Sequence, residues 1–201
     1  MIGVGRIVAP MIESPFALQK YLAATKLAYP PEERAVTRFL INIETKTGFG
    51  CIDDILGIPE IALLDGVVLG RVDMTGSLGL GRDEINTAPI LEIARALSQK
   101  LKAKGKEFGV GGGVSAHSLP FFKDLGPGAI DVYETRKVIF GCPGALATGE
   151  AGILKAVGFE LMWLKNKRDY YSLIASEDNQ RITMLETRYR DLIAKAGGQV
   201  G

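Results

Sequence analysis

Cysteine, histidine and tryptophan are scarce in this sequence of 201 residues, with two, one and one occurrences respectively. The two cysteines, Cys51 and Cys142, are too few for a disulfide framework or a zinc ribbon, so free thiols are expected. The only histidine, His117, falls at an expected helix start, where a surface or capping role is favoured over catalysis. These absences exclude a disulfide-stapled domain and leave acidic side chains as the main candidates for a site.

Long apolar runs and an excess of one charge are missing as well. No stretch approaches the roughly 18 apolar residues that are needed to span a bilayer, and the N-terminus lacks the pattern of a secretory signal. The formal net charge is +1, and acidic residues are interspersed among the basic ones of the C-terminal region. We therefore expect a cytoplasmic protein with no membrane and no nucleic acid partner.

What the chain does have is a strongly alternating pattern of strands and helices. It is 47% hydrophobic and holds 25 glycines, many of them directly after an expected strand. Helical segments separate the strands, and only helix is expected from about residue 145 onward. Alternation of this kind predicts an α/β fold with a parallel sheet and right-handed crossovers. The expected strands are 6–13, 39–44, 67–73, 108–114 and 131–140.

Two acidic residues end two neighbouring strands of this pattern. Glu44 ends one strand, and Asp73 ends the next one in a glycine-rich turn. The C-terminal ends of parallel strands lie at the same end of a sheet. The two carboxylates are therefore expected to share one divalent cation. Glu13 ends a further strand as a possible third pocket carboxylate, although an interaction with the helix N-terminus beside Ser14 is slightly favoured.

Three other groups are candidates with open alternatives. Arg71 holds a carboxylate or phosphate, or it pairs with Glu44 or Glu134. The glycines of 111–113 bind phosphate through backbone amides, or they allow tight packing at the end of the sheet. They do not form the dinucleotide-binding pattern. Glu134 and Arg136 are expected to form a buried ion pair inside the barrel rather than to act in catalysis.

Several motifs together resemble the HpcH/HpaI aldolase and citrate lyase family. The resemblance covers roughly residues 7–140 and is closest to a divergent branch with two further segments. The main motifs are Val8-Ala-Pro-Met-Ile-Glu-Ser14, Asn42-Ile-Glu-Thr45, Gly70-Arg-Val-Asp73 with Ser77-Leu-Gly79, and Gly111-Gly-Gly-Val-Ser115. The two segments of the divergent branch are Tyr133-Glu-Thr-Arg-Lys137 and Glu160-Leu-Met-Trp-Leu-Lys165.

This resemblance implies a (β/α)₈ TIM barrel and a lyase or aldolase that makes or breaks a C–C bond next to a pyruvate-like 2-oxo acid. It implies that Glu44 and Asp73 bind a divalent metal that stabilises an enolate as a Lewis acid. Hard oxygen ligands suit Mg²⁺ or Mn²⁺. The substrate carboxylate is expected at the backbone amides around Val72 and Asp73 in the glycine-rich turn. Gly70, Arg71 and Glu13 are further expected substrate-binding residues.

The sequence also departs from the family pattern. Five strands are expected where the barrel needs eight, and the general base and substrate arginine of the family's second and third strands have no counterpart. The chain is therefore expected to be an N-terminally incomplete barrel, either truncated or completed by another chain. The partial barrel is expected at 1–144, with a helical extension of the same domain at 145–201. The alternative function is an inactive fragment, or a module that binds metal and carboxylate without the base. The apolar tail is expected to pack on another protomer of a homo-oligomer.

Overall fold

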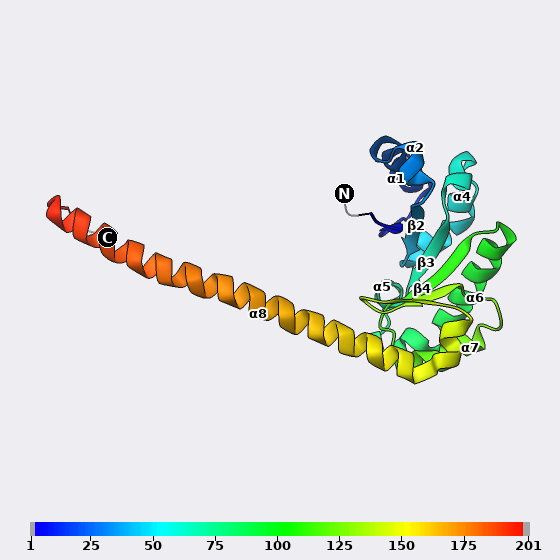
Figure 1. The fold of residues 1–201 in the computed structure, drawn as a ribbon. Helices are drawn as coiled ribbons and strands as arrows, with labels where there is room; N and C mark the ends of the chain where they lie inside the picture. The colour runs from blue at the N-terminus through cyan, green and yellow to red at the C-terminus, as the bar shows by residue number, and fades with distance from the viewer. Residues whose placement is uncertain (1–2, 199–201) are drawn as a thin grey trace. The chain divides into compact units, whose positions relative to one another are not determined.

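The computed structural model describes residues 3–198 and places six strands in one sheet (Figure 1). The sheet order follows the chain from β1 to β6. The first five strands are parallel, and β6 runs antiparallel to β5. The predicted order of five parallel neighbours is therefore confirmed. The strands are β1 Arg6–Ala9, β2 Arg38–Ile43, β3 Gly66–Gly70, β4 Glu107–Gly111, β5 Val132–Glu134 and β6 Ile139–Gly141.

Helices connect the parallel strands and complete a curled, partial barrel of the TIM type. Two of the predicted helix starts are confirmed. Ser14 caps α1 by accepting a hydrogen bond from the amide of Ala17 at 3.2 Å, and Thr87 immediately precedes α6. The α-helices are α1 Pro15–Ala28, α2 Pro31–Arg34, α3 Lys46–Gly50, α4 Ile52–Leu56, α5 Arg71–Ser77, α6 Ala88–Ala103, α7 Leu119–Asp124 and α8 Gly144–Lys195. Short 3₁₀ helices are η1 Pro59–Leu63, η2 Arg82–Asn86 and η3 Ala116–Ser118.

The two faces of the sheet have different tasks because side chains alternate along each strand. One face carries Ile41, Val67 and Phe108, which are buried in the core. The helices cover this face with apolar side chains such as Leu22 of α1 and Leu97 of α6. The opposite, inner face carries glycines and charged residues such as Gly66 and Glu107 beside the buried apolar side chains of Leu40 and Val68.

Two aspartates fix the strands at their N-terminal ends. The Asp65 carboxylate accepts a hydrogen bond from the amide of Phe39 at 2.7 Å, and Asp131 accepts one from Phe108 at the same distance. Each aspartate lies directly before one strand and accepts a hydrogen bond from an amide near the start of the neighbouring strand. The repetition of this bond helps to set the register between parallel strands, in which Leu40 lies beside Gly66.

Several strands end earlier than the sequence predicted. The first ends at Ala9, directly before Pro10, because proline cannot donate to the strand ladder. The third ends at Gly70, since Arg71 already begins α5. Asp73 therefore lies in the first turn of a helix and not at the end of a strand, which corrects the predicted strand 67–73.

The predicted single strand at 131–140 is wrong as well. It consists of β5 and β6 joined by a tight turn, in which the amide of Thr135 donates to the carbonyl of Val138 at 2.9 Å. Arg136 lies exposed in this turn. Within residues 3–198 no ion pair joins it to Glu134, so the predicted buried pair is not formed.

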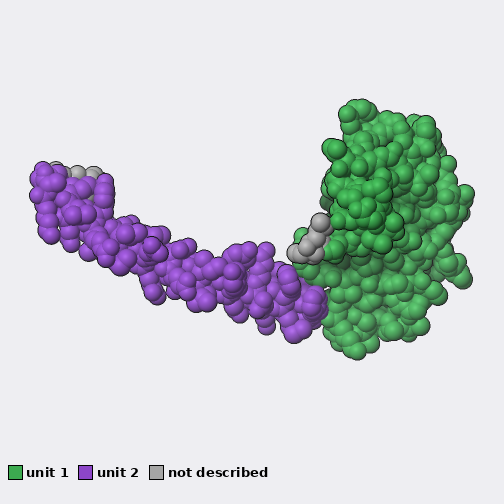
Figure 2. Space-filling model, turned by 45° about the horizontal axis from the view of Figure 1, so that its top comes forward, with its two compact units in different colours: residues 1–157 green, residues 158–201 purple. Residues whose placement is uncertain are grey.

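The C-terminal region is one long helix, as predicted from about residue 145. The helix α8 begins at Gly144 and has a break at Gly149, where φ is 55°. The chain divides into compact units at residues 1–157 and 158–201 (Figure 2). The expected division into a partial barrel at 1–144 and a helical extension of the same domain at 145–201 stays a prediction. No helix in the described part of the chain is long and apolar enough to cross a membrane.

Candidate site at the C-terminal ends of the strands

Glu44 is a buried carboxylate directly after β2. The residue is only 5% exposed. Oε1 accepts a hydrogen bond from the amide of Met11 at 2.9 Å, and Oε2 accepts one from Nδ2 of Asn42 at 3.2 Å. No ion pair to Glu44 is formed within residues 3–198. A buried carboxylate without a counter-ion is uncommon and marks this position as a candidate for cation binding.

The two partners of Glu44 have unusual features of their own. The Oδ1 atom of Asn42 is buried and has no hydrogen-bond partner. Met11 has a φ of 54°, a backbone conformation that costs of order 1–3 kcal/mol for a residue with a side chain. Strained backbone and unsatisfied buried oxygens concentrate at functional sites. Both features support this end of the sheet as the working end.

Gly70 provides the space that the Glu44 carboxylate occupies. A Cβ atom placed on Gly70 would lie 2.4 Å from Oε2 of Glu44 and 2.8 Å from its Cβ atom. Both distances are too short for any side chain. A glycine at this position of β3 is therefore required by the side chain of the neighbouring strand.

Arg71 is a completely buried residue whose guanidinium joins three segments of the chain. Its Nε donates to the carbonyl of Gly111 at 3.0 Å, and Nη2 donates to the carbonyl of Gly112 at 2.9 Å and to Oγ of Ser118 at 3.2 Å. Its Nη1 donates to Oδ1 of Asn86 at 2.6 Å. The guanidinium thus holds the turn after β4 and the segment after α5 against the start of α5.

The surroundings of Arg71 leave no exposed guanidinium surface. The Cζ atom lies 5.0 Å and 5.2 Å from the ring centres of Phe121 and Phe122. Burial lowers the pKa of Arg71 to about 10, so it stays charged at neutral pH. Neither of its two expected partners, Glu44 and Glu134, accepts the four hydrogen bonds that it makes. A substrate contact through its side chain has no support in this geometry.

The start of α5 also approaches the glycine turn after β4. A Cβ atom on Gly112 would lie 2.7 Å from the amide nitrogens of both Arg71 and Val72, and the φ of Gly112 is 81°. Glycine is therefore required at this position for close packing and for its left-handed conformation. The structure favours packing for the turn 111–113. The proposed phosphate contact of these glycines stays a prediction.

The other two acidic candidates are exposed. Asp73 lies exposed on the first turn of α5. Glu13 lies exposed in the segment between β1 and α1, where its Oε1 accepts a hydrogen bond from Oγ1 of Thr45 at 2.5 Å. Thr45 directly follows Glu44 and caps α3. Glu13 is thus attached to the segment that follows Glu44, whereas Asp73 lies in helix α5, which begins directly after the next strand.

Glu134 is a further carboxylate on the inner face, at the C-terminal end of β5. A Cβ atom on Gly111 would lie 3.0 Å from its Oε1. Burial raises the pKa of Glu134, the charge of Arg6 opposes this effect, and the charge of Glu107 adds to it. Glu134 therefore repeats the arrangement of Glu44, in which an acidic side chain lies over a glycine of an adjacent strand.

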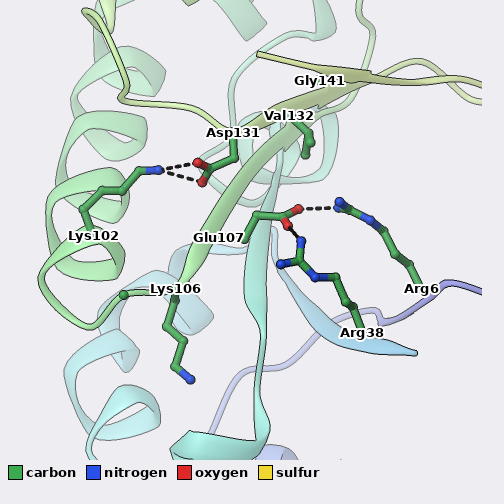
Figure 3. A pocket seen from close by; sticks show the side chains of 9 residues that line it. Arg6, Arg38, Lys102, Lys106, Glu107, Asp131, Val132 and Gly141 are labelled. Atoms are coloured by element: carbon green, nitrogen blue, oxygen red, sulfur yellow. Dashed lines mark hydrogen bonds and ion pairs between the residues drawn. The ribbon is translucent and has the colours of Figure 1, made fainter. Parts of the chain in front are cut away.

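The opposite end of the sheet carries a second charged cluster (Figure 3). Glu107, the first residue of β4, forms ion pairs with Arg6 and Arg38, the first residues of β1 and β2. Lys102 binds both carboxylate oxygens of Asp131 at 2.6 and 2.7 Å. These side chains line a cavity of about 560 Å³. They lie at the N-terminal ends of strands, where stabilising contacts rather than catalytic groups are found in such barrels.

The oxygen atoms around Glu44 are ligands of the type that binds a hard divalent cation. Within the described residues, no three His, Cys, Asp or Glu side chains are grouped so that they could hold a metal alone. Mg²⁺, however, keeps several waters and commonly uses only one or two protein carboxylates. Glu44 without a counter-ion and the exposed Asp73 supply oxygen ligands of this type. Their assignment as ligands stays a prediction.

The strand order and the connecting helices define a partial (β/α) barrel. Its candidate site lies at the C-terminal ends of the strands. No protein-family model matches the chain. A hydroxypyruvate/pyruvate aldolase of Roseobacter denitrificans (strain ATCC 33942 / OCh 114) is 28% identical over 131 residues, covering 52% of this chain and 49% of that protein. The chain thus spans about half the length of this curated relative.

Solved structures show the same fold. Citrate synthase SbnG has a TM-score of 0.53 and 17% identity, with 83% of this chain and 65% of that chain covered. An HpcH/HpaI aldolase from Desulfitobacterium hafniense DCB-2 has a TM-score of 0.53 and 17% identity, with 66% and 57% covered. A family protein from Burkholderia cenocepacia J2315 has a TM-score of 0.50 and 18% identity, with 62% and 56% covered. The resemblance to the HpcH/HpaI aldolase and citrate lyase family is confirmed.

Sequence reasoning missed several residues of this region. Asn42 lies in one of the family-like motifs and had no expected role, although its spacing of two from Glu44 places both side chains on one face of the strand. The amide of Met11 had no expected role either, because a positive φ at a methionine has no local sequence signal. Asn86 and Ser118, the side-chain partners of Arg71, lie 15 and 47 residues away from it and could not be found by spacing.

Proposed function

We propose that this chain is part of a divalent-metal-dependent carbon–carbon lyase that acts next to the carbonyl group of a pyruvate-like 2-oxo acid. One observation carries the proposal. Glu44 is buried at the C-terminal end of β2 without an ion-pair partner within the described residues, and the neighbouring strand leads through Gly70 to Asp73. A cation at this position would compensate the buried charge.

Each candidate residue then has a distinct task. Glu44 and Asp73 hold Mg²⁺ or Mn²⁺, which supplies Lewis-acid stabilisation of an enolate when it is bound. The backbone at Gly70 and Val72 accommodates the carboxylate of the substrate. Arg71 is a positioning residue, because its guanidinium anchors the start of α5 from inside the protein.

Two facts support the choice of substrate class. The similar protein from Roseobacter denitrificans is a hydroxypyruvate/pyruvate aldolase by name, and a 2-oxo acid offers the oxygens that chelate a hard cation. Glu13 lies beside the same loop through its bond to Thr45. We assign it to the rim of the substrate pocket, where an acidic side chain would bind a hydroxyl group rather than a carboxylate.

Metal binding is the first test of the proposal. Mn²⁺ is titrated into the full chain by electron paramagnetic resonance, with and without oxalate as an analogue of the pyruvate enolate. We expect binding that oxalate strengthens, and a loss of at least tenfold in affinity for Glu44→Gln and for Asp73→Asn. Asp54→Asn is the matched control, because Asp54 is also exposed in the first turn of a short helix. Equal binding by the parent and the two site variants would reject the metal site.

Proton exchange at pyruvate is the second test, and it separates two functions. Exchange of the pyruvate methyl protons with deuterium, followed by NMR, requires both enolate stabilisation and a base. Exchange that depends on Mn²⁺ and Glu44 supports the lyase. Metal and oxalate binding without any exchange supports the alternative, a module that binds metal and carboxylate but lacks the base.

A further inference from the structure

The exposed part of α8 carries a heptad repeat over residues 161–192. A heptad repeat has two positions in every seven residues that are normally apolar. In this helix every side chain at these two positions is apolar except Arg168 and Asp178. Most of the apolar ones are about half exposed, for example Leu161 at 52% and Leu185 at 48%. One position comprises Leu161, Arg168, Ala175, Ile182 and Tyr189, and the other comprises Leu164, Tyr171, Asp178, Leu185 and Leu192.

A spacing of 3.5 residues is the signature of a helix that winds around another helix. A single stripe of this length would expose more apolar surface than an isolated monomer normally carries. The stripe lies within residues 158–201, which form a compact unit of their own (Figure 2). We propose that this stripe, the α8 seam, pairs with the α8 seam of a second copy of this chain in an antiparallel coiled coil.

The two charged residues of the seam determine the direction and the register. In an antiparallel pair the two heptad positions face each other, so one register places Arg168 of each copy opposite Asp178 of the other. Two residues that face each other in this register form a layer, and their residue numbers always add up to 346. Within residues 161–185, where the two seams overlap, the remaining layers pair apolar with apolar side chains, and Tyr189 and Leu192 lie beyond this overlap. These layers are Leu161 with Leu185, Leu164 with Ile182, and Tyr171 with Ala175, each formed twice about the two-fold axis.

Other arrangements leave a charge without a partner. A parallel, in-register pair would place Arg168 opposite Arg168 and Asp178 opposite Asp178. Moving the antiparallel register by one heptad would place Arg168 opposite Leu185 or Tyr171. Charged seam residues select one register by penalising the alternatives. The sequence of the seam thus specifies the antiparallel register by charge complementarity.

In the single chain, Arg168 forms an ion pair with its neighbour Asp169. The distance from Nη2 to Oδ1 is 2.7 Å, and the two side chains are 69% and 65% exposed. Exposed pairs of this kind contribute little to stability. The Arg168 side chain is therefore available to turn toward Asp178 of a second copy at small cost.

Charge exchange is the first test and uses the full chain in sedimentation velocity at micromolar concentrations. Arg168→Asp and Asp178→Arg each create like charges in two layers, so each is expected to weaken the dimer at least tenfold. The double variant R168D/D178R restores both pairs and is expected to return the parent affinity. Arg190→Asp and Asp191→Arg, which lie outside the seam, are matched controls without effect. A parent that is monomeric, or single variants that dimerise like the parent, would overturn the proposal.

Disulfide cross-linking is the second test and reads the direction of the helices. In a Cys51→Ser/Cys142→Ser background, Leu161→Cys and Leu185→Cys are introduced separately and together. The two positions are 24 residues apart, about 36 Å along one helix, so they cannot join within one chain. Only the double variant is expected to form a covalent dimer on mild oxidation. Cross-linking by Leu161→Cys alone would show a parallel pair, and no cross-linking in the double variant would reject the seam.

Discussion

Glu44 and Gly70, on neighbouring strands, are matched so closely that a Cβ atom on Gly70 would lie 2.4 Å from Oε2 of Glu44. The same relation occurs twice more on the inner face of the sheet. Added Cβ atoms would lie 2.7 Å from the Cβ of Glu107 at Gly66 and 3.0 Å from Oε1 of Glu134 at Gly111. The inner face thus holds each of these acidic side chains over a glycine of an adjacent strand.

Gly70→Ala is expected to destabilise the protein by about 1–3 kcal/mol, because the added methyl group overlaps the Glu44 side chain. Equilibrium unfolding in urea measures this change. Gly76→Ala is the matched control. Gly76 lies exposed in α5 with open space at its Cβ position, so alanine is expected to stabilise the protein by about 0.5–1 kcal/mol there.

A double-mutant cycle attributes the Gly70 effect to Glu44. Glu44→Gly removes both atoms that the new methyl group would meet. Gly70→Ala is therefore expected to cost less in the Glu44→Gly background, with a coupling free energy of about 0.5–3 kcal/mol. Strict additivity of the two substitutions would show that the two residues do not constrain each other.

Arg71→Met is expected to destabilise the protein by about 3–5 kcal/mol, because it leaves buried carbonyls without their charged donor. Arg71→Lys is not a conservative change here, since an ammonium group cannot reproduce the planar set of donors. Thermal unfolding followed by circular dichroism compares both variants with the parent. A Lys variant that unfolds like the parent would contradict the anchoring role of the guanidinium.

Glu134→Gln is expected to raise stability at neutral pH. Burial raises the pKa of Glu134 above its value in the unfolded chain, so the folded state binds more protons between the two values. The free energy of unfolding therefore falls as pH rises through this window, and glutamine removes that loss. The advantage of the variant should vanish below about pH 4, where glutamate is protonated in both states. A less stable variant at neutral pH would show that attraction to Arg6 outweighs burial.

Glu107→Gln is expected to destabilise the protein by about 1–3 kcal/mol. It removes two ion pairs of a carboxylate whose side chain is 8% exposed. Glu92→Gln is the matched control, because Glu92 is 68% exposed in its pair with Arg95, and exposed pairs contribute at most about 1 kcal/mol. Urea unfolding of both variants at low and high salt measures the difference. Equal effects would argue against a stabilising role of this cluster.

Local patterns predicted the order of the elements well. The Ser14–Pro15 pair marks a helix start through a side-chain cap that acts within one turn, and Thr87 precedes the second predicted start without a side-chain cap bond. Both starts are confirmed. Alternating strands and helices predicted the parallel order. Element ends were less accurate where the local signal is absent. The start of α5 has no side-chain cap at Gly70, so the apolar run was extended to Asp73.

Local sequence patterns were enough to predict that acidic residues follow neighbouring parallel strands, because the alternation of strands with helices depends on nearby residues. The burial of each charge and its contacts depend on how distant segments pack together. Arg71 illustrates the difference, since its hydrogen-bond partners lie between 15 and 47 residues along the chain. The fit of Glu44 over Gly70 likewise depends on strand register, in which Ile43 lies beside Leu69. Register is fixed by packing across the whole sheet, and no local pattern records it.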